Sequence, residues 1–204
     1  MNDLDHDPCL LIERARVGER DAREQLLESY RNYLRLLAYT GMGEALKDKA
    51  DPSDLVQETL LKAHANFLDF RGRNEAELAG WLRQILARNL IDLGRRYQAT
   101  EARQVSRERS LEELLDQSSL ALGRLIPGGG LSPSEHAQRR ELSVVLADAL
   151  ADLSADHRNV IVLRSLEERS WEDVARKMGR STGAVRVLWA RALTRLRPLI
   201  EARL

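Results

Sequence analysis

Apolar residues recur at helical spacing along most of the chain, and no segment alternates between apolar and polar residues long enough to predict a β-strand. Helices are predicted over Leu26–Tyr39, from a start near Asp51–Asp54 to about Phe67, and from about Glu75 to Tyr97. Pro52 falls in the first turn of the second helix, where its missing N–H costs no hydrogen bond. Residues 71–74 contain a glycine and are predicted to form a loop. The pattern therefore predicts an all-α fold.

The last quarter of the chain has the pattern of helices joined by tight turns. Ser154 precedes an apolar helical segment, and the sequence that begins at Ser170 fits the acidic variant of a capping box. Gly179 stands where a left-handed residue ends a helix, and Ser181 can cap the helix that follows. The residues predicted to bury one face of that helix are Val185, Trp189, Ala192 and Leu196. A short helix, a turn with glycine and a second helix are typical of a helix-turn-helix motif.

Between these regions, residues 98–138 lack a long apolar period and contain a Pro-Gly-Gly-Gly stretch at 127–130. Glycine and proline in this setting favour a flexible connection. We therefore predict two small helical domains, residues 1–97 and residues 139–204, joined by a flexible linker at 98–138.

Charge is distributed in blocks, although the chain has 32 basic and 32 acidic residues and a net charge of zero. Residues 1–70 hold 9 basic and 14 acidic side chains, and residues 71–110 hold 9 and 5. Residues 111–157 hold 3 and 8, and residues 158–204 hold 11 and 5. Two basic blocks separated by an acidic one indicate two contacts with a polyanion, although arginine-rich helices can also be merely solvated.

Composition excludes several classes of protein. The single cysteine, Cys9, allows no internal disulfide framework, and no apolar run approaches the roughly 18 residues of a membrane span. The acidic N-terminus does not resemble a signal peptide, so a cytoplasmic protein is expected. The sequence has no phosphate loop, no metal-ligand cluster and no nucleophile with a paired base, so we expect neither an enzyme nor a bound cofactor or metal. The four histidines are scattered at His6, His64, His136 and His157.

The two faces of the helix that starts near Asp54 differ in character. Its core stripe is predicted to be Leu55, Val56, Thr59, Leu60, Ala63 and Phe67. The other side carries Asp54, Gln57, Glu58 and Leu61. Carboxylates beside an exposed leucine suit a contact with a partner protein, and a solvated acidic face is the alternative.

The third helix and the loop before it carry candidate nucleic-acid ligands. Asn89 offers a donor and an acceptor to a base edge, and Arg88 can pair with Asp92 four residues later. The loop at 70–74 combines an aromatic residue, two arginines and a glycine, which are the parts needed to hold an unstacked base, although Phe70 can equally be a core residue. In the last helix, Arg186 could pair with a guanine edge and Arg191 with a phosphate.

Several motifs occur in an order that resembles the extracytoplasmic-function (ECF) group of the bacterial sigma-70 family. They are Asp54-Leu55-Val56-Gln57-Glu58-Thr59, Phe70-Arg71-Gly72, Trp81-Leu82-Arg83-Gln84-Ile85-Leu86-Ala87-Arg88-Asn89, Ser170-Trp171-Glu172-Asp173-Val174-Ala175 and Thr182-Gly183-Ala184-Val185-Arg186. The resemblance covers roughly residues 20–97 and 140–198. It implies a sigma factor that binds core RNA polymerase and directs promoter recognition during transcription initiation. An anti-sigma factor is a further candidate partner, and association with the nucleoid would follow from binding polymerase.

The resemblance also implies roles for particular residues. The polymerase clamp, in the largest subunit, would be contacted by Asp54, Gln57, Glu58 and Leu61. The −10 element would be melted and bound by Phe70, Arg71, Asn74, Arg83, Arg88, Asn89, Arg95 and Arg96. The −35 element would be read by Arg180, Ser181, Thr182, Arg186, Val187, Ala190 and Arg191, from a domain that also touches the polymerase flap. Many members have a polar and then a basic residue where this chain has Val187 and Leu188, so a less hydrogen-bonded readout is expected.

Two other classes of protein remain alternatives at this point. A stand-alone helix-turn-helix regulator would bind duplex DNA without polymerase, and it would have no reason to carry the acidic face of the second helix. A polymerase-binding adaptor or decoy would need no promoter readout, and Val187 and Leu188 favour that interpretation.

Overall fold

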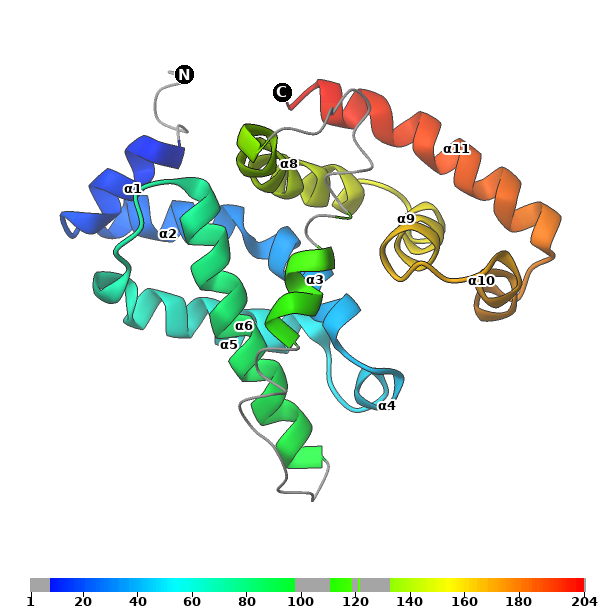
Figure 1. Cartoon of the computed structure of the whole chain (residues 1–204), viewed down its shortest axis with the longest axis horizontal. Helices are drawn as coiled ribbons and strands as arrows, with labels where there is room; N and C mark the ends of the chain where they lie inside the picture. The colour runs from blue at the N-terminus through cyan, green and yellow to red at the C-terminus, as the bar shows by residue number, and fades with distance from the viewer. Residues whose placement is uncertain (1–7, 98–110, 119–120, 122–132, 204) are drawn as a thin grey trace. The chain divides into compact units, whose positions relative to one another are not determined.

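A computed structural model describes residues 8–97, 111–118, 121 and 133–203 of the chain. Every regular element in these ranges is a helix, which confirms the predicted all-α class. The chain divides into two compact units, Met1–Gln117 and Ser118–Leu204. Figure 1 shows the helices of each unit. The Pro-Gly-Gly-Gly stretch lies outside the described residues.

The first unit is a helical bundle in which α5 is central. This helix packs against α2, α3 and α6, and α1 packs against α2. The helices are α1 (Pro8–Arg16), α2 (Arg20–Ser29), α3 (Arg31–Gly41), α4 (Glu44–Lys47), α5 (Pro52–Ala65) and α6 (Glu75–Tyr97), with a 3₁₀ turn η2 (Phe67–Asp69). The predicted helices that became α5 and α6 are confirmed.

The helix predicted over Leu26–Tyr39 is instead the end of α2 followed by α3. The chain leaves the helix at Tyr30, whose N–H donates to Leu27 O at 3.2 Å. Tyr30 and Tyr33 are both buried and lie edge to face, with ring centroids 6.2 Å apart. The helix is interrupted at Tyr30 while both rings stay buried, which a helical period alone does not predict.

The start of α5 follows from its first residues. The Asp51 carboxylate accepts a hydrogen bond from the backbone N–H of Ser53 at 2.7 Å, so Asp51 is the N-cap. Pro52 occupies the first turn, as predicted. This backbone hydrogen bond, followed by one to the Ser53 side chain, holds the pKa of Asp51 below its usual value.

Two parts of the segment predicted as a linker are helical. Residues 111–118 form a helix whose Leu115 is fully buried, and α8 (Pro133–Ala151) begins before residue 139. A Cβ added at Gly41 would lie 2.9 Å from Leu90 Cδ1 and 3.0 Å from Leu115 Cδ2. The absent side chain at Gly41 therefore lets the 111–118 helix pack closely on the first unit.

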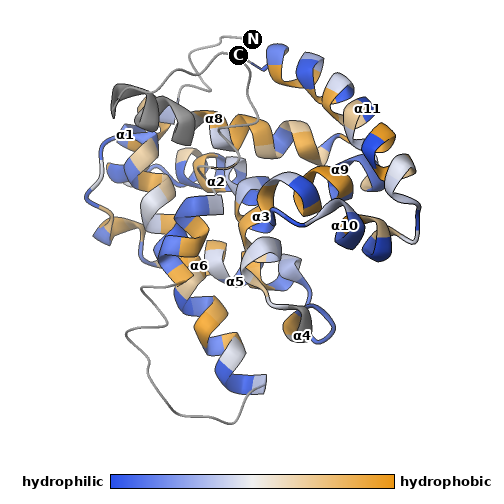
Figure 2. Cartoon of the chain, turned by 45° about the vertical axis from the view of Figure 1, so that its right-hand side comes forward, coloured by the Kyte–Doolittle hydropathy of each residue, from blue (hydrophilic) through white to orange (hydrophobic). Residues whose placement is uncertain are grey.

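The second unit is built around its last helix. The elements are α8, α9 (Ala155–Ile161), a π turn η3 (Val162–Leu166), α10 (Trp171–Met178) and α11 (Thr182–Glu201). α11 packs against α8, α9 and α10. Hydrophobic and hydrophilic residues alternate along it (Figure 2), and its predicted core residues Val185, Ala192 and Leu196 are buried, with Trp189 half-buried.

The predicted signals of the helix-turn-helix are present in the geometry. Ser170 Oγ accepts from the Asp173 N–H at 3.1 Å, and Ser181 Oγ accepts from the Ala184 N–H at 3.2 Å. Gly179 ends α10 in the left-handed conformation with φ of 61°. Ser154 occupies the N-cap position of α9 but makes no side-chain capping hydrogen bond.

Candidate functional sites

The exposed face of α5 is the first candidate site. Asp54, Gln57 and Leu61 are exposed and Glu58 is half-buried, while the whole predicted core stripe is buried. Leu61 keeps 65% of its surface exposed, although leucine is an apolar residue. An apolar side chain among acidic and amide groups, on a helix held firmly from behind, is a surface suited to a partner protein.

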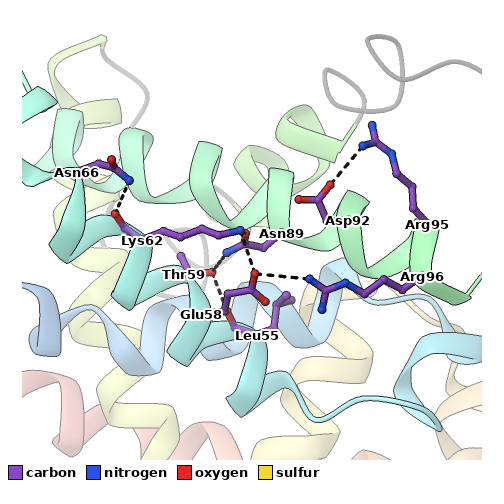
Figure 3. Close-up of polar contacts among 9 residues, drawn as sticks. All are labelled: Leu55, Glu58, Thr59, Lys62, Asn66, Asn89, Asp92, Arg95 and Arg96. Atoms are coloured by element: carbon purple, nitrogen blue, oxygen red, sulfur yellow. Dashed lines mark hydrogen bonds and ion pairs between the residues drawn. The ribbon is translucent and has the colours of Figure 1, made fainter.

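A polar network joins this face of α5 to α6 (Figure 3). Lys62 Nζ lies 2.9 Å from Glu58 Oε1 and 2.5 Å from Asn89 Oδ1. Asn89 Nδ2 donates to Thr59 Oγ1 at 2.9 Å, and the Thr59 hydroxyl donates to Leu55 O at 2.8 Å. Asn89 is only 1% exposed, so both ends of its amide are occupied inside the bundle.

The end of α6 carries exposed cations near the same network. Arg96 Nη2 lies 4.0 Å from Glu58 Oε1, so Glu58 is close to two cations at once. Arg95 pairs with Asp92 at 3.3 Å. These guanidinium groups are exposed and able to reach a polyanion.

The loop at residues 70–74, before α6, is anchored to the bundle by Phe70. Phe70 is buried and packs on Phe67 and Trp81, with ring centroids at 5.8 Å and 5.3 Å. A Cβ added at Gly72 would lie 2.3 Å from the Phe70 ring, so only glycine fits there. Asn74 Oδ1 accepts from the Glu77 N–H at 2.9 Å and so helps to begin α6, a local role that the sequence analysis missed.

Arg83 is also an interior residue. Its Nη1 donates to the Tyr33 hydroxyl at 2.8 Å, and its Nη2 lies 3.0 Å from Asp116 Oδ1. The side chain thus links α6 to α3 and to the 111–118 helix. Its 9% side-chain exposure leaves no surface for an external ligand in this conformation.

The residues predicted for the −10 element therefore fall into two groups. The exposed group is Arg71, Asn74, Arg88, Arg95 and Arg96. The buried group is Phe70, Arg83 and Asn89. In the free protein each side chain of the buried group contacts neighbours in the bundle, so its direct contact with the −10 element stays a prediction.

The helix-turn-helix face is open by comparison. The exposed members of the predicted set are Arg180, Ser181, Arg186, Val187, Ala190 and Arg191, and Thr182 is half-buried. Arg180 is anchored to Asp156 at 2.5 Å, which joins the turn before α11 to the start of α9. The second unit thus presents most of its predicted residues exposed, on the turn before α11 and along the first half of that helix.

Trp171, for which no individual role was predicted, contacts several side chains at the start of this surface. The Arg186 guanidinium lies 5.6 Å and that of Arg164 4.9 Å from the centre of its ring. Trp189 meets Trp171 edge to face at 5.7 Å and donates its indole N–H to Ser165 at 3.3 Å. A tryptophan one residue after a helix cap is the sequence signal that could have suggested this role.

Within the described residues, no group of three or more histidine, cysteine, aspartate or glutamate side chains could hold a metal ion. None of the described helices is long and apolar enough to cross a membrane. The arrangement offers a partner-protein surface and cationic surfaces.

Comparison with known proteins finds a family match in each unit. The family model "Sigma-70 region 2" matches residues 26–100, and "Sigma-70, region 4" matches residues 149–198. An ECF RNA polymerase sigma-E factor of Haemophilus influenzae is 28% identical over 176 residues, which cover 86% of each chain. The RNA polymerase sigma factor YlaC of Bacillus subtilis is 28% identical over 184 residues, covering 89% of this chain and 93% of that protein.

A longer relative shows the same similarity. The ECF RNA polymerase sigma factor BldN of Streptomyces coelicolor is 29% identical over 192 residues, which cover 93% of this chain and 64% of BldN. The two family matches occupy more than half of the chain and fall one in each compact unit. The chain belongs to the sigma-70 family of RNA polymerase sigma factors, and within it to the ECF group.

Proposed function

We propose that the two units divide promoter recognition between them while this sigma factor directs RNA polymerase to its start sites. The exposed face of α5 docks on the clamp of the largest polymerase subunit. The cationic end of α6 and the loop before it hold the melted −10 strand. α11 reads the −35 element as a duplex, and the second unit also touches the polymerase flap.

The observation that carries this proposal is the pairing of an exposed, rigidly backed acidic and apolar helix face with a separate, open helix-turn-helix surface. A stand-alone regulator needs only the second of these, and a decoy needs only the first. The second helix of a helix-turn-helix enters the major groove with its N-terminal residues against base edges, and the exposed residues of α11 lie in that part of the helix.

The buried polar residues act by positioning in this proposal. Asn89 and Thr59 fix α6 against α5, and Arg83 fixes α6 against α3. Phe70 fixes the loop that carries the exposed Arg71. The exposed arginines then supply the phosphate contacts, which dominate affinity for nucleic acid and make it depend on salt.

Transcription in vitro with core RNA polymerase and a library of genomic fragments tests the proposal. We expect new start sites that share two upstream motifs. The double variant Asp54→Ala/Glu58→Ala should lose polymerase binding and all new starts. The matched control Asp21→Ala/Glu24→Ala removes two exposed carboxylates from α2 and should leave both unchanged.

Two results would contradict the proposal. Equal loss in both double variants would mean that net charge, and not the α5 face, governs docking. New starts without any shared upstream motif would remove the role assigned to α11.

A further inference from the structure

We infer that Val187 reads the 5-methyl group of a thymine in the −35 element, an inference that rests on the proposed function of α11. Val187 is 51% exposed on the outward side of this helix. It is the one large apolar side chain in the described part of the second unit that is exposed to this degree. Leu188, its neighbour, is half-buried and so belongs to the packing of the unit.

The surroundings of Val187 make it accessible to a groove wall. Gly183 and Ala190 lie four residues before and three residues after it, on the same side of the helix, and both are exposed. Nothing lies within 4 Å of a Cβ added at Gly183, so open space surrounds this position. Val187 therefore protrudes between two small residues.

The arginines on either side of Val187 would hold its side chain against DNA. Arg186 and Arg191 are exposed on either side, and Arg186 is held over the Trp171 ring. Arginines of this kind contact phosphates or a guanine edge and set the register of the helix in the groove.

The chemistry of valine then selects the base. In the major groove, thymine alone among the four bases presents a methyl group. A valine makes no hydrogen bonds, so facing it with a guanine or adenine edge would strip water from polar atoms without replacing their partners. Contact with the thymine methyl removes apolar surface from water on both sides.

The test uses the holoenzyme formed by the full chain and core RNA polymerase. A −35 sequence is first selected from duplexes randomised over that element. Each thymine in the selected sequence is then replaced by deoxyuridine, which removes the methyl group and keeps every hydrogen-bonding atom. We expect one replacement to weaken binding about fourfold, the effect of one buried methyl group.

Variants assign that effect to the side chain. In Val187→Ser the deoxyuridine penalty should disappear, and in Val187→Thr, which keeps one methyl group, it should persist. Val17→Ser makes the same change at a residue that is 86% exposed in the first unit, and it should leave the penalty unchanged.

Two outcomes would overturn the inference, and they differ in what else they affect. A selected sequence with no deoxyuridine penalty, or with a penalty that survives Val187→Ser, would overturn the role of Val187 alone. Failure to select any upstream sequence, with polymerase binding intact, would overturn the proposed −35 readout together with it.

Discussion

The two helices assigned to DNA, α6 in the first unit and α11 in the second, present their candidate residues in opposite ways. On α6, Asn89 and Arg83 are buried and hydrogen-bonded to other helices. On α11, Arg186 and Val187 lie on the surface. A helix that inserts into the major groove of a duplex contacts it through exposed side chains. In the proposed function, the buried residues of α6 instead fix the shape of the surface that its exposed arginines offer.

The largest expected effect is a loss of stability when a buried candidate residue is replaced, compared with an exposed one. Arg83→Ala removes a hydrogen bond to Tyr33 and an ion pair with Asp116 inside the first unit. We expect a loss of about 3 kcal/mol in the free energy of unfolding, since the buried guanidinium makes both contacts and hydrogen bonds to charged groups contribute more than neutral ones. Denaturant unfolding of the full chain measures this. A loss no larger than that of the exposed control Arg88→Ala would contradict the structural role.

A second comparison sets the buried Asn89 of α6 against the exposed Arg186 of α11. Asn89→Ala leaves Thr59 and Lys62 without the amide that joins them, and it should cost about 2 kcal/mol of unfolding free energy. Arg186→Ala on α11 should change stability by less than about 0.5 kcal/mol, because the side chain is exposed, and should still weaken promoter binding. If Asn89→Ala unfolds like the wild type while transcription fails, Asn89 contacts DNA directly.

The burial of the candidate residues on α6 could partly be predicted from the sequence. The bounds of α6 were predicted because its apolar period runs unbroken from Leu78 to Leu90. That same period places Asn89 three residues after the buried Leu86, and Arg83 four residues after the buried Ala79, so both lie on the core face.

Other features could not be predicted from local pattern. The partner of Arg83 on α3 is 50 residues away, and the partner of Asn89 on α5 is 30 residues away. In the helix at 111–118, Leu115 is fully buried and lies beside Gly41, about 70 residues earlier in the chain. Tertiary packing of this kind decides short helices more than their own propensity does.

The N-caps of α5 and α11 also differ in chemistry, so their contributions to stability should depend differently on pH. Asp51 caps α5 with a carboxylate whose pKa is lowered, first by the backbone N–H of Ser53, whereas Ser181 caps α11 with a hydroxyl that does not titrate. The stability from the Asp51 cap is therefore complete above the unfolded-state pKa of about 3.9 and is lost as the pH falls through the lower folded-state value.

Each cap variant should cost about 1 kcal/mol at neutral pH. The cost of Asp51→Ala should shrink as the pH falls into the acid range, and the cost of Ser181→Ala should not. Denaturant unfolding at several pH values measures both. Parallel pH profiles for the two variants would contradict the assignment of Asp51 as a charged cap.

The smallest expected effect concerns Glu58. This residue is part of the exposed face of α5 and also pairs with two nearby cations, one on α5 and one on α6. Its carboxylate lies 2.9 Å from Lys62 and 4.0 Å from Arg96. In the free protein it offsets two charges next to the proposed −10 surface, and docking on polymerase would engage it elsewhere. Glu58→Gln should therefore raise the affinity of the free chain for a single-stranded oligonucleotide. Because exposed ion pairs are weak, we expect a gain of about threefold at low salt.

Asp54→Asn is the matched control for this change. It alters the net charge of the same helix by the same amount from a position one turn earlier, away from the pairs that Glu58 makes. The control should raise the affinity less, and the gain from Glu58→Gln should vanish near 1 M salt, where the screening length falls to about 3 Å. Equal gains from both variants would show that total charge alone sets DNA affinity. The network of Figure 3 would then connect α5 and α6 without restraining the cations beside them.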